Sequence, residues 1–183
     1  IITDFAFAGD GTTPPYYECV AVSKGADPVS GGWWLYEIVA STTALNDYPK
    51  FGVWHDGYYM TSNQSTDKVY VFERDLMLTG NTGARAIYQS FTTGSVSEFF
   101  VPLPADAADN HTLPAAGTPL PFFAYYDQAW GGGTDGVKIW TATTNWTAGT
   151  LTIAGPTQVN TSAFDASYDS NWDDVPQPNG VEL

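Results

Sequence analysis

Residues 47–72, DYPKFGVWHDGYYMTSNQSTDKVYVF, decide the fold that we predict for this chain. Three short runs, 51–55, 58–61 and 68–72, are rich in β-branched and aromatic residues, and polar residues separate them. Runs of this kind, bounded by Gly, Asn, Asp and Ser, are typical of β-strands. The segment therefore predicts a three-stranded antiparallel meander.

The pair Asp56-Gly57 lies between the first two runs. In a two-residue type I′ turn both central residues need φ > 0, which Gly adopts freely and Asp tolerates better than most residues. We therefore expect a tight type I′ hairpin at this pair. The polar cluster 63–67 predicts the second turn of the meander.

The same pattern recurs later in the chain. The run 121–126, PFFAYY, and the run 136–140, GVKIW, are separated by polar and Gly-rich residues, as in the first copy. The corresponding positions in the two copies are Asn63 and Asp127, Gln64 and Gln128, and Phe72 and Trp140. A weaker, earlier copy comprises 16–23 and 31–36. The repetition predicts several sheets of similar construction.

The spacing of the copies indicates a fold class. Aligning Tyr36, Phe72 and Trp140 gives spacings of about 36 and 68 residues. The first is a typical repeat length of propellers and solenoids, and the second is one repeat with a long insertion. We therefore predict an all-β fold of repeated antiparallel meanders, β-propeller-like. The alternative is a β-sandwich whose strands resemble one another.

Three repeats do not close a propeller, which typically has four to eight blades. We therefore interpret 1–183 as a single all-β propeller-like segment that is part of a larger protein. Outside the copies we expect strands at 1–8, 86–91, 151–153 and 157–159, a helical turn or strand extension at 73–78, and a long surface loop at 104–120.

The charge of the chain restricts its partners. The chain has six Lys and Arg residues and twenty Asp and Glu residues, which gives a formal net charge of −14. Nucleic acid and anionic membranes need a basic surface, so we exclude both as partners. The sequence also contains no apolar run of the length that crosses a bilayer as a helix, so we expect no membrane insertion. The acidic composition is compatible with a secreted protein, a halotolerant protein or one that binds divalent cations, and solubility alone also explains it.

Three stretches resemble a known group of proteins. They are ECVAVSKGADPVSGGWWLYE at 18–37, LNDYPKFGVWHDGYYMTSNQ at 45–64 and LPADAADNHTLPAAGTP at 103–119. They are similar to large secreted bacterial proteins of poorly defined function with a β-propeller-like repeat region. The resemblance implies a secreted, extracellular or cell-surface location, and a chain that continues past 176–178 into further blades. It implies no catalytic residues.

Catalytic patterns are weak in this sequence. A sialidase needs an arginine cluster to hold a carboxylate, and the chain has only Arg74 and Arg85. His55 and His111 are the only histidines and lack zinc-ligand spacing. No Gly-x-Ser-x-Gly elbow is present. The sequence therefore favours a non-enzyme without excluding an enzyme, and it supplies no catalytic residue.

Calcium is the cofactor that the sequence suggests, because calcium takes oxygen ligands from carboxylates and backbone carbonyls. One predicted cluster contains Asp127 and Asp135, with glycines between them. The other contains Asp169 and Asp173. Neither matches an EF-hand. The alternative is that these aspartates cap turns of the backbone.

Tryptophans beside turns suggest a carbohydrate-binding surface, since aromatic rings can stack on sugars while polar groups fix their orientation. We predict Trp130 and Trp54 as stacking residues, with Asp127 and Gln128 as polar contacts. The alternative is packing between sheets, which we expect for Trp34 and Trp140.

These observations predict a secreted or cell-surface binding and adhesion module whose partner is carbohydrate or another protein chain. One alternative is the non-catalytic part of a secreted glycoside hydrolase. The other is a structural or assembly protein that pairs with neighbouring chains through strand edges.

Overall fold

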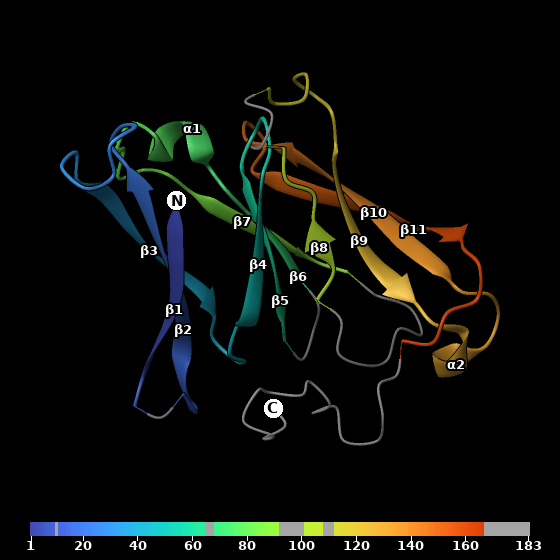
Figure 1. The fold of residues 1–183 in the computed structure, drawn as a ribbon. Coiled ribbons are helices and arrows are strands. Elements are labelled where there is room, and N and C mark those ends of the chain that lie inside the picture. The colour runs from blue at the N-terminus through green and yellow to red at the C-terminus, as the bar shows by residue number, and fades with distance from the viewer. Residues whose placement is uncertain (10, 65–67, 92–100, 108–111, 167–183) are drawn as a thin grey trace, which may run out of the picture.

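The computed structural model describes residues 1–9, 11–64, 68–91, 101–107 and 112–166, which form three antiparallel sheets (Figure 1). Sheet A consists of β1 (Ile2–Ala8), β2 (Thr13–Ser23) and β3 (Trp33–Ser41). Sheet B consists of β4 (Asp47–Val53), β5 (Tyr58–Asn63), β6 (Lys68–Phe72) and β7 (Ala86–Ser90). Sheet C consists of β8 (Leu103–Pro104), β9 (Leu120–Tyr126), β10 (Gly136–Asn145) and β11 (Thr150–Asn160). The prediction of an all-β fold is confirmed.

Sheet B is the predicted meander with its predicted fourth strand. Its strands are neighbours in the order of the sequence, and each pair is antiparallel. Sheet C has the same construction, with β9 and β10 in the positions of β5 and β6. Helical structure among the described residues is limited to the single turns α1 (Arg74–Met77) and α2 (Gln128–Gly131). The 73–78 segment thus forms a helical turn.

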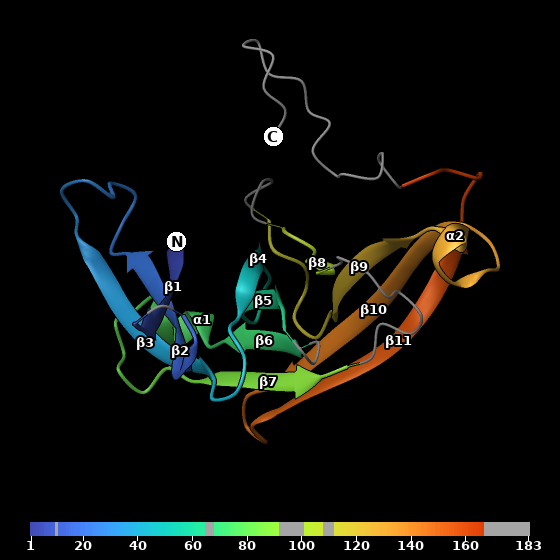
Figure 2. The ribbon, with the colours of Figure 1, turned by 90° about the horizontal axis from the view of Figure 1, so that it is seen from below.

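Sheet B lies between sheets A and C and is covered on both faces (Figure 2). Successive side chains of a strand point to opposite faces of its sheet. In β5, Tyr58 and Met60 face sheet A, whereas Tyr59 faces sheet C. In β6, Tyr70 faces sheet A and Val71 faces sheet C. Seven of the eleven residues in these two strands are apolar or aromatic, consistent with two covered faces.

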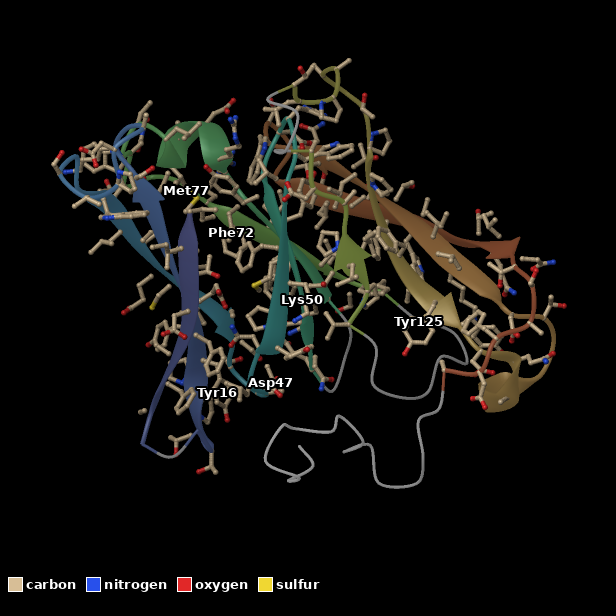
Figure 3. All side chains as sticks on the ribbon, viewed as in Figure 1. Tyr16, Asp47, Lys50, Phe72, Met77 and Tyr125 are labelled. Carbon is tan, nitrogen blue, oxygen red and sulfur yellow. The ribbon has the colours of Figure 1, made fainter. Side chains whose placement is uncertain are left out.

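Two separate cores result from this arrangement. Between sheets A and B, Phe72 and Met77 pack with apolar residues of β2 and β3, and Figure 3 shows both side chains in this space. Between sheets B and C, the rings of Trp140 and Phe122 stack at 5.5 Å with an interplanar angle of 7°. Trp140 is 1% exposed, so its predicted role in packing between sheets is confirmed.

The prediction of a type I′ turn at Asp56-Gly57 is wrong. The last strand pair is Val53 with Tyr58, so the loop contains four residues, and the Trp54 N–H donates to the Gly57 carbonyl at 3.0 Å. Neither Asp56 nor Gly57 has a positive φ. The loop is longer because the Trp54 side chain turns inward to the core between sheets B and C.

The prediction of two separate strands at 151–153 and 157–159 is also wrong, since both lie in β11. The strand stays continuous because its register against β10 shifts by a bulge between Ile139 and Thr141. Such a bulge absorbs extra residues without ending the pairing.

The carboxyl group of Glu18 is completely buried between sheets A and B. Its Oε2 accepts a hydrogen bond from the Asn46 side-chain amide at 2.7 Å, while its Oε1 has no hydrogen-bond partner among the described residues. Burial raises the pKa of Glu18 from 4.5 to about 7, the Asn46 hydrogen bond opposes this shift, and the nearby Asp4 carboxylate adds to it. Glu18 therefore keeps its proton up to nearly neutral pH.

Because of this carboxyl group, the free energy of unfolding should fall as pH rises from about 4.5 to 7. In that window the unfolded chain has released the Glu18 proton and the folded protein has kept it, so the folded state binds more protons. The loss is about 1.4 kcal/mol per pH unit, or about 3 kcal/mol in total. We expect Glu18→Gln to remove this loss and to be more stable than the wild type at pH 8. Urea unfolding of both proteins at several pH values measures this pH dependence of the free energy of unfolding.

The matched control for Glu18→Gln is Glu37→Gln, which changes an exposed carboxylate on the same sheet. Its unfolding free energy should follow the pH dependence of the wild type. An identical pH dependence for wild type and Glu18→Gln would contradict the assignment of the buried proton.

Candidate ligand-binding site

A pocket of about 420 Å³ lies between sheets B and C, where β7 and β11 contact each other. Both are the last strands of their sheets, and Figure 2 shows them meeting along one side of the molecule. The lining residues are Gln89, Ser90, Phe91, Trp140, Leu151, Thr152, Ile153 and Gly155. The pocket is therefore formed where two sheets of the repeat meet.

The floor of the pocket is aromatic. Trp140 is held by Phe122, stacked on its ring, and by Phe91, whose ring meets it edge-on with centroids 5.7 Å apart. The indole Nε1 of Trp140 is buried and has no hydrogen-bond partner among the described residues. An unpaired buried donor costs about 1–3 kcal/mol.

The rim of the pocket is polar and uncharged. Gln89, Ser90 and Thr152 are exposed and offer amide and hydroxyl groups, which both donate and accept hydrogen bonds. None of the described residues that line the pocket carries an ionisable side chain. This neutrality contrasts with the net charge of −14 of the chain.

A second pocket, of about 370 Å³, lies beside β4 and β9 and is lined by Lys50, Leu103, Phe123 and Tyr125 among others. Figure 3 shows Lys50 on β4 and Tyr125 on β9. The Lys50 ammonium group already lies 3.2 Å from the centroid of the Tyr48 ring. The walls are otherwise apolar, so few polar groups are left to orient a hydroxylated ligand.

The structure does not bring the predicted ligand-binding residues together. Trp54 is only 8% exposed, and its Nε1 donates to the Thr118 carbonyl at 2.8 Å, so it is not a stacking platform. Thr118 precedes β9 whereas Asp127 and the exposed Gln128 follow it, which places these residues toward opposite ends of that strand. Trp130 lies in α2, and its side chain is outside the described part of the structure.

The two aspartates of the first predicted calcium cluster bind the backbone. Asp127 accepts hydrogen bonds from the N–H groups of Ala129 at 2.7 Å and Ala166 at 2.8 Å. Asp135 accepts from Gln128 at 2.6 Å and Phe164 at 2.7 Å. Both carboxylates are 1% exposed, and each uses one oxygen for each bond. They fasten the segment after β11 to α2 and sheet C.

Calcium binding stays a prediction. Within the described residues, no group of three or more His, Cys, Asp or Glu side chains is arranged to hold a metal ion. Asp169 and Asp173 lie outside the described residues. The alternative interpretation, that aspartates cap backbone groups, accounts for all the hydrogen bonds of Asp127 and Asp135 given above.

Sequence reasoning missed the rim of the pocket. Gln89, Ser90 and Thr152 lie in strands with no motif around them, and only the pairing of strands and the packing of two sheets bring them together. Trp140 was recognised as a packing residue, but its free indole N–H depends on what surrounds the ring.

Searches against protein-family models, curated proteins and solved structures find no match to this chain. The resemblance to secreted bacterial propeller-like proteins therefore remains a prediction. In the described part of the chain, no helix has the length and apolar character needed to span a membrane.

The carboxylate of Asp135 should hold the segment after β11 in place. In Asp135→Asn the side chain keeps one acceptor oxygen and gains an NH₂ group, which cannot accept a backbone N–H. We expect unfolding free energy to fall by about 1–3 kcal/mol and the Phe164 amide to exchange faster with solvent. Hydrogen exchange measures the second effect. The control is Asp75→Asn, which changes an exposed carboxylate in the same way. If Asp135→Asn left the exchange rate of the Phe164 amide unchanged, the result would contradict the proposed role of Asp135 in holding this segment.

Proposed function

We propose that this chain is a binding module for an uncharged, hydroxylated ligand, a carbohydrate, which occupies the pocket between β7 and β11. The observation that carries this proposal is a pocket at the junction of two sheets that combines the aromatic residues Trp140 and Phe91 with uncharged polar residues of β7 and β11. A sugar presents hydroxyl oxygens that accept from an N–H and hydroxyl groups that pair with amides and hydroxyls. It also presents apolar ring faces that pack against aromatic side chains.

The size of the pocket supports a small ligand. Its volume of about 420 Å³ falls within the range of about 300–1,000 Å³ for small-molecule sites. That range accommodates one or two sugar units better than a long chain held inside the pocket. A longer glycan would extend from the rim past Gln89 and Thr152, which are exposed.

The pocket supports binding rather than glycoside hydrolysis. Hydrolysis of a glycosidic bond generally uses two carboxyl groups that flank the bond. The lining residues that the structure describes include no Asp or Glu. We therefore favour a binding or adhesion module over a glycosidase, and we retain the secreted or cell-surface location that the sequence resemblance implies.

We also propose that the three sheets are successive blades of a β-propeller. Sheets B and C are four-stranded meanders in sequence order, and face-to-face contacts on both sides of sheet B repeat the same type of packing. A β-sandwich has two sheets around one core, whereas the described residues of this chain form three sheets and two core clusters.

The proposed function predicts binding of neutral glycans through this pocket. We expect a glycan array to select neutral glycans over sialylated or sulfated ones. The selected glycan should shift the Trp140 indole N–H signal in a ¹H–¹⁵N spectrum, because Trp140 lines the pocket. Thr152→Arg should fill the rim and weaken binding at least tenfold, about 1.4 kcal/mol.

Thr13→Arg is the matched control, because it places the same side chain at an exposed position of β2 in sheet A, away from the pocket. Repeating the array in EDTA tests the calcium prediction independently, since only a calcium-dependent site loses binding. Neutral glycans that bind without shifting the Trp140 signal, or equally to Thr152→Arg, would place the site elsewhere.

A further inference from the structure

Within the described residues, sheet A has three strands, one fewer than sheets B and C. In those sheets β7 pairs antiparallel with β6 and β11 pairs antiparallel with β10. In sheet A the third strand is β3, and among the described residues it pairs with β2 alone. In the described part of the chain, no strand therefore pairs with the backbone N–H and C=O groups along the outer edge of β3, at the position that a fourth strand occupies in sheets B and C.

The edge of β3 also lacks the features that normally prevent strand addition. Proteins protect exposed edges with prolines, lysines, bulges or very short strands. β4 has Pro49, Lys50 and a register shift, β11 has Pro156 and a register shift, and β8 has two residues. Residues 33–39 of β3 contain no Pro, Gly or Lys and pair with β2 in regular register. This edge is thus suited to pairing.

A groove of about 370 Å³ runs along this edge. It is lined by four consecutive residues of β3, 34–37, and by Gly80 and Thr82 from the loop between α1 and β7. Consecutive residues of a strand point to opposite faces, so a groove lined by all four follows the backbone edge rather than one face. Gly80 lies against the Trp34 ring, where a Cβ would come within 2.5 Å of the ring atoms. The loop therefore forms a second wall beside the edge.

Charge indicates the chemistry of the partner. Glu37 is exposed, and it is in register with Cys19 and, across β2, with Asp4. Leu35, two residues earlier on the same face, is 78% exposed. A second copy of this chain would bring a net charge of −14 to this acidic edge, and like charges in contact are unfavourable. A segment with basic and apolar residues is complementary.

We propose that β3 accepts a fourth strand from another protein. The occupant is an extended peptide segment that pairs antiparallel with β3, as β7 does with β6, with a basic residue opposite Glu37 and an apolar residue near Leu35. Main-chain hydrogen bonds supply affinity and the alternating side chains supply specificity, as in other strand-addition complexes. This surface is separate from the carbohydrate pocket, so either proposal can fail without the other.

The test uses the full chain and a synthetic seven-residue peptide that alternates valine with lysine. We expect NMR shifts and slowed hydrogen exchange at amides of 33–39, and binding measurable by fluorescence anisotropy. A version with N-methyl groups on alternate backbone amides keeps the side chains but cannot pair as a strand, and its affinity should fall more than tenfold. A version with glutamate in place of lysine should bind more weakly.

Exchanging the charge of Glu37 tests the register. Glu37→Lys should weaken the lysine peptide about threefold and strengthen the glutamate peptide by a similar factor, the scale of a cross-strand charge pair. Asp75→Lys makes the same change of charge at an exposed position of α1 and should leave both affinities unchanged.

Three results would overturn the proposal. The first is equal affinity for the N-methylated peptide, which would mean that the contact is not strand pairing. The second is protection at β4, β7 or β11 in place of β3. The third is a dimer in sedimentation experiments without peptide, with 33–39 protected, which would assign the edge to a second copy of this chain.

Discussion

Burial of both faces of sheet B is the constraint on which the rest of the structure depends. The five residues 58–62 of β5 are all buried, and Tyr59 and Met60 are completely inaccessible. A strand reaches this state only when another layer of the protein covers each of its faces. Sheets A and C supply these covers, so the two cores and the order of the sheets follow from the composition of two short strands.

The surfaces that we assign to function lie where this packing ends. The neutral pocket is at the junction of the outermost strands β7 and β11, and the groove follows the unpaired edge of β3. Neither site disturbs the cores. Both sites form at the margins of neighbouring sheets, where the packing of the sheets leaves a hollow. The two sites differ in charge, since one is lined by uncharged groups and the other includes Glu37.

Local pattern was sufficient to predict the strands and insufficient to predict the sites. The alternation in 51–72 and its recurrence predicted the meanders because strand pairing between neighbours in sequence is a local property. The loop at Asp56 differs from prediction because Trp54 turns toward sheet C, and a tertiary contact decided that. The partners of Asp135 include the Phe164 N–H, 29 residues away in sequence. The pocket rim combines residues of two sheets, which no spacing in the sequence reveals.

Native-state hydrogen exchange is the most direct test of the two-sided burial of sheet B. Amides that open only on global unfolding exchange slowest. We predict that the paired amides of β5 and β6 are the slowest in the chain and share one free energy of opening, with β1 and β11 exchanging faster. Exchange in β5 and β6 as fast as in β1 or β11 would contradict the account.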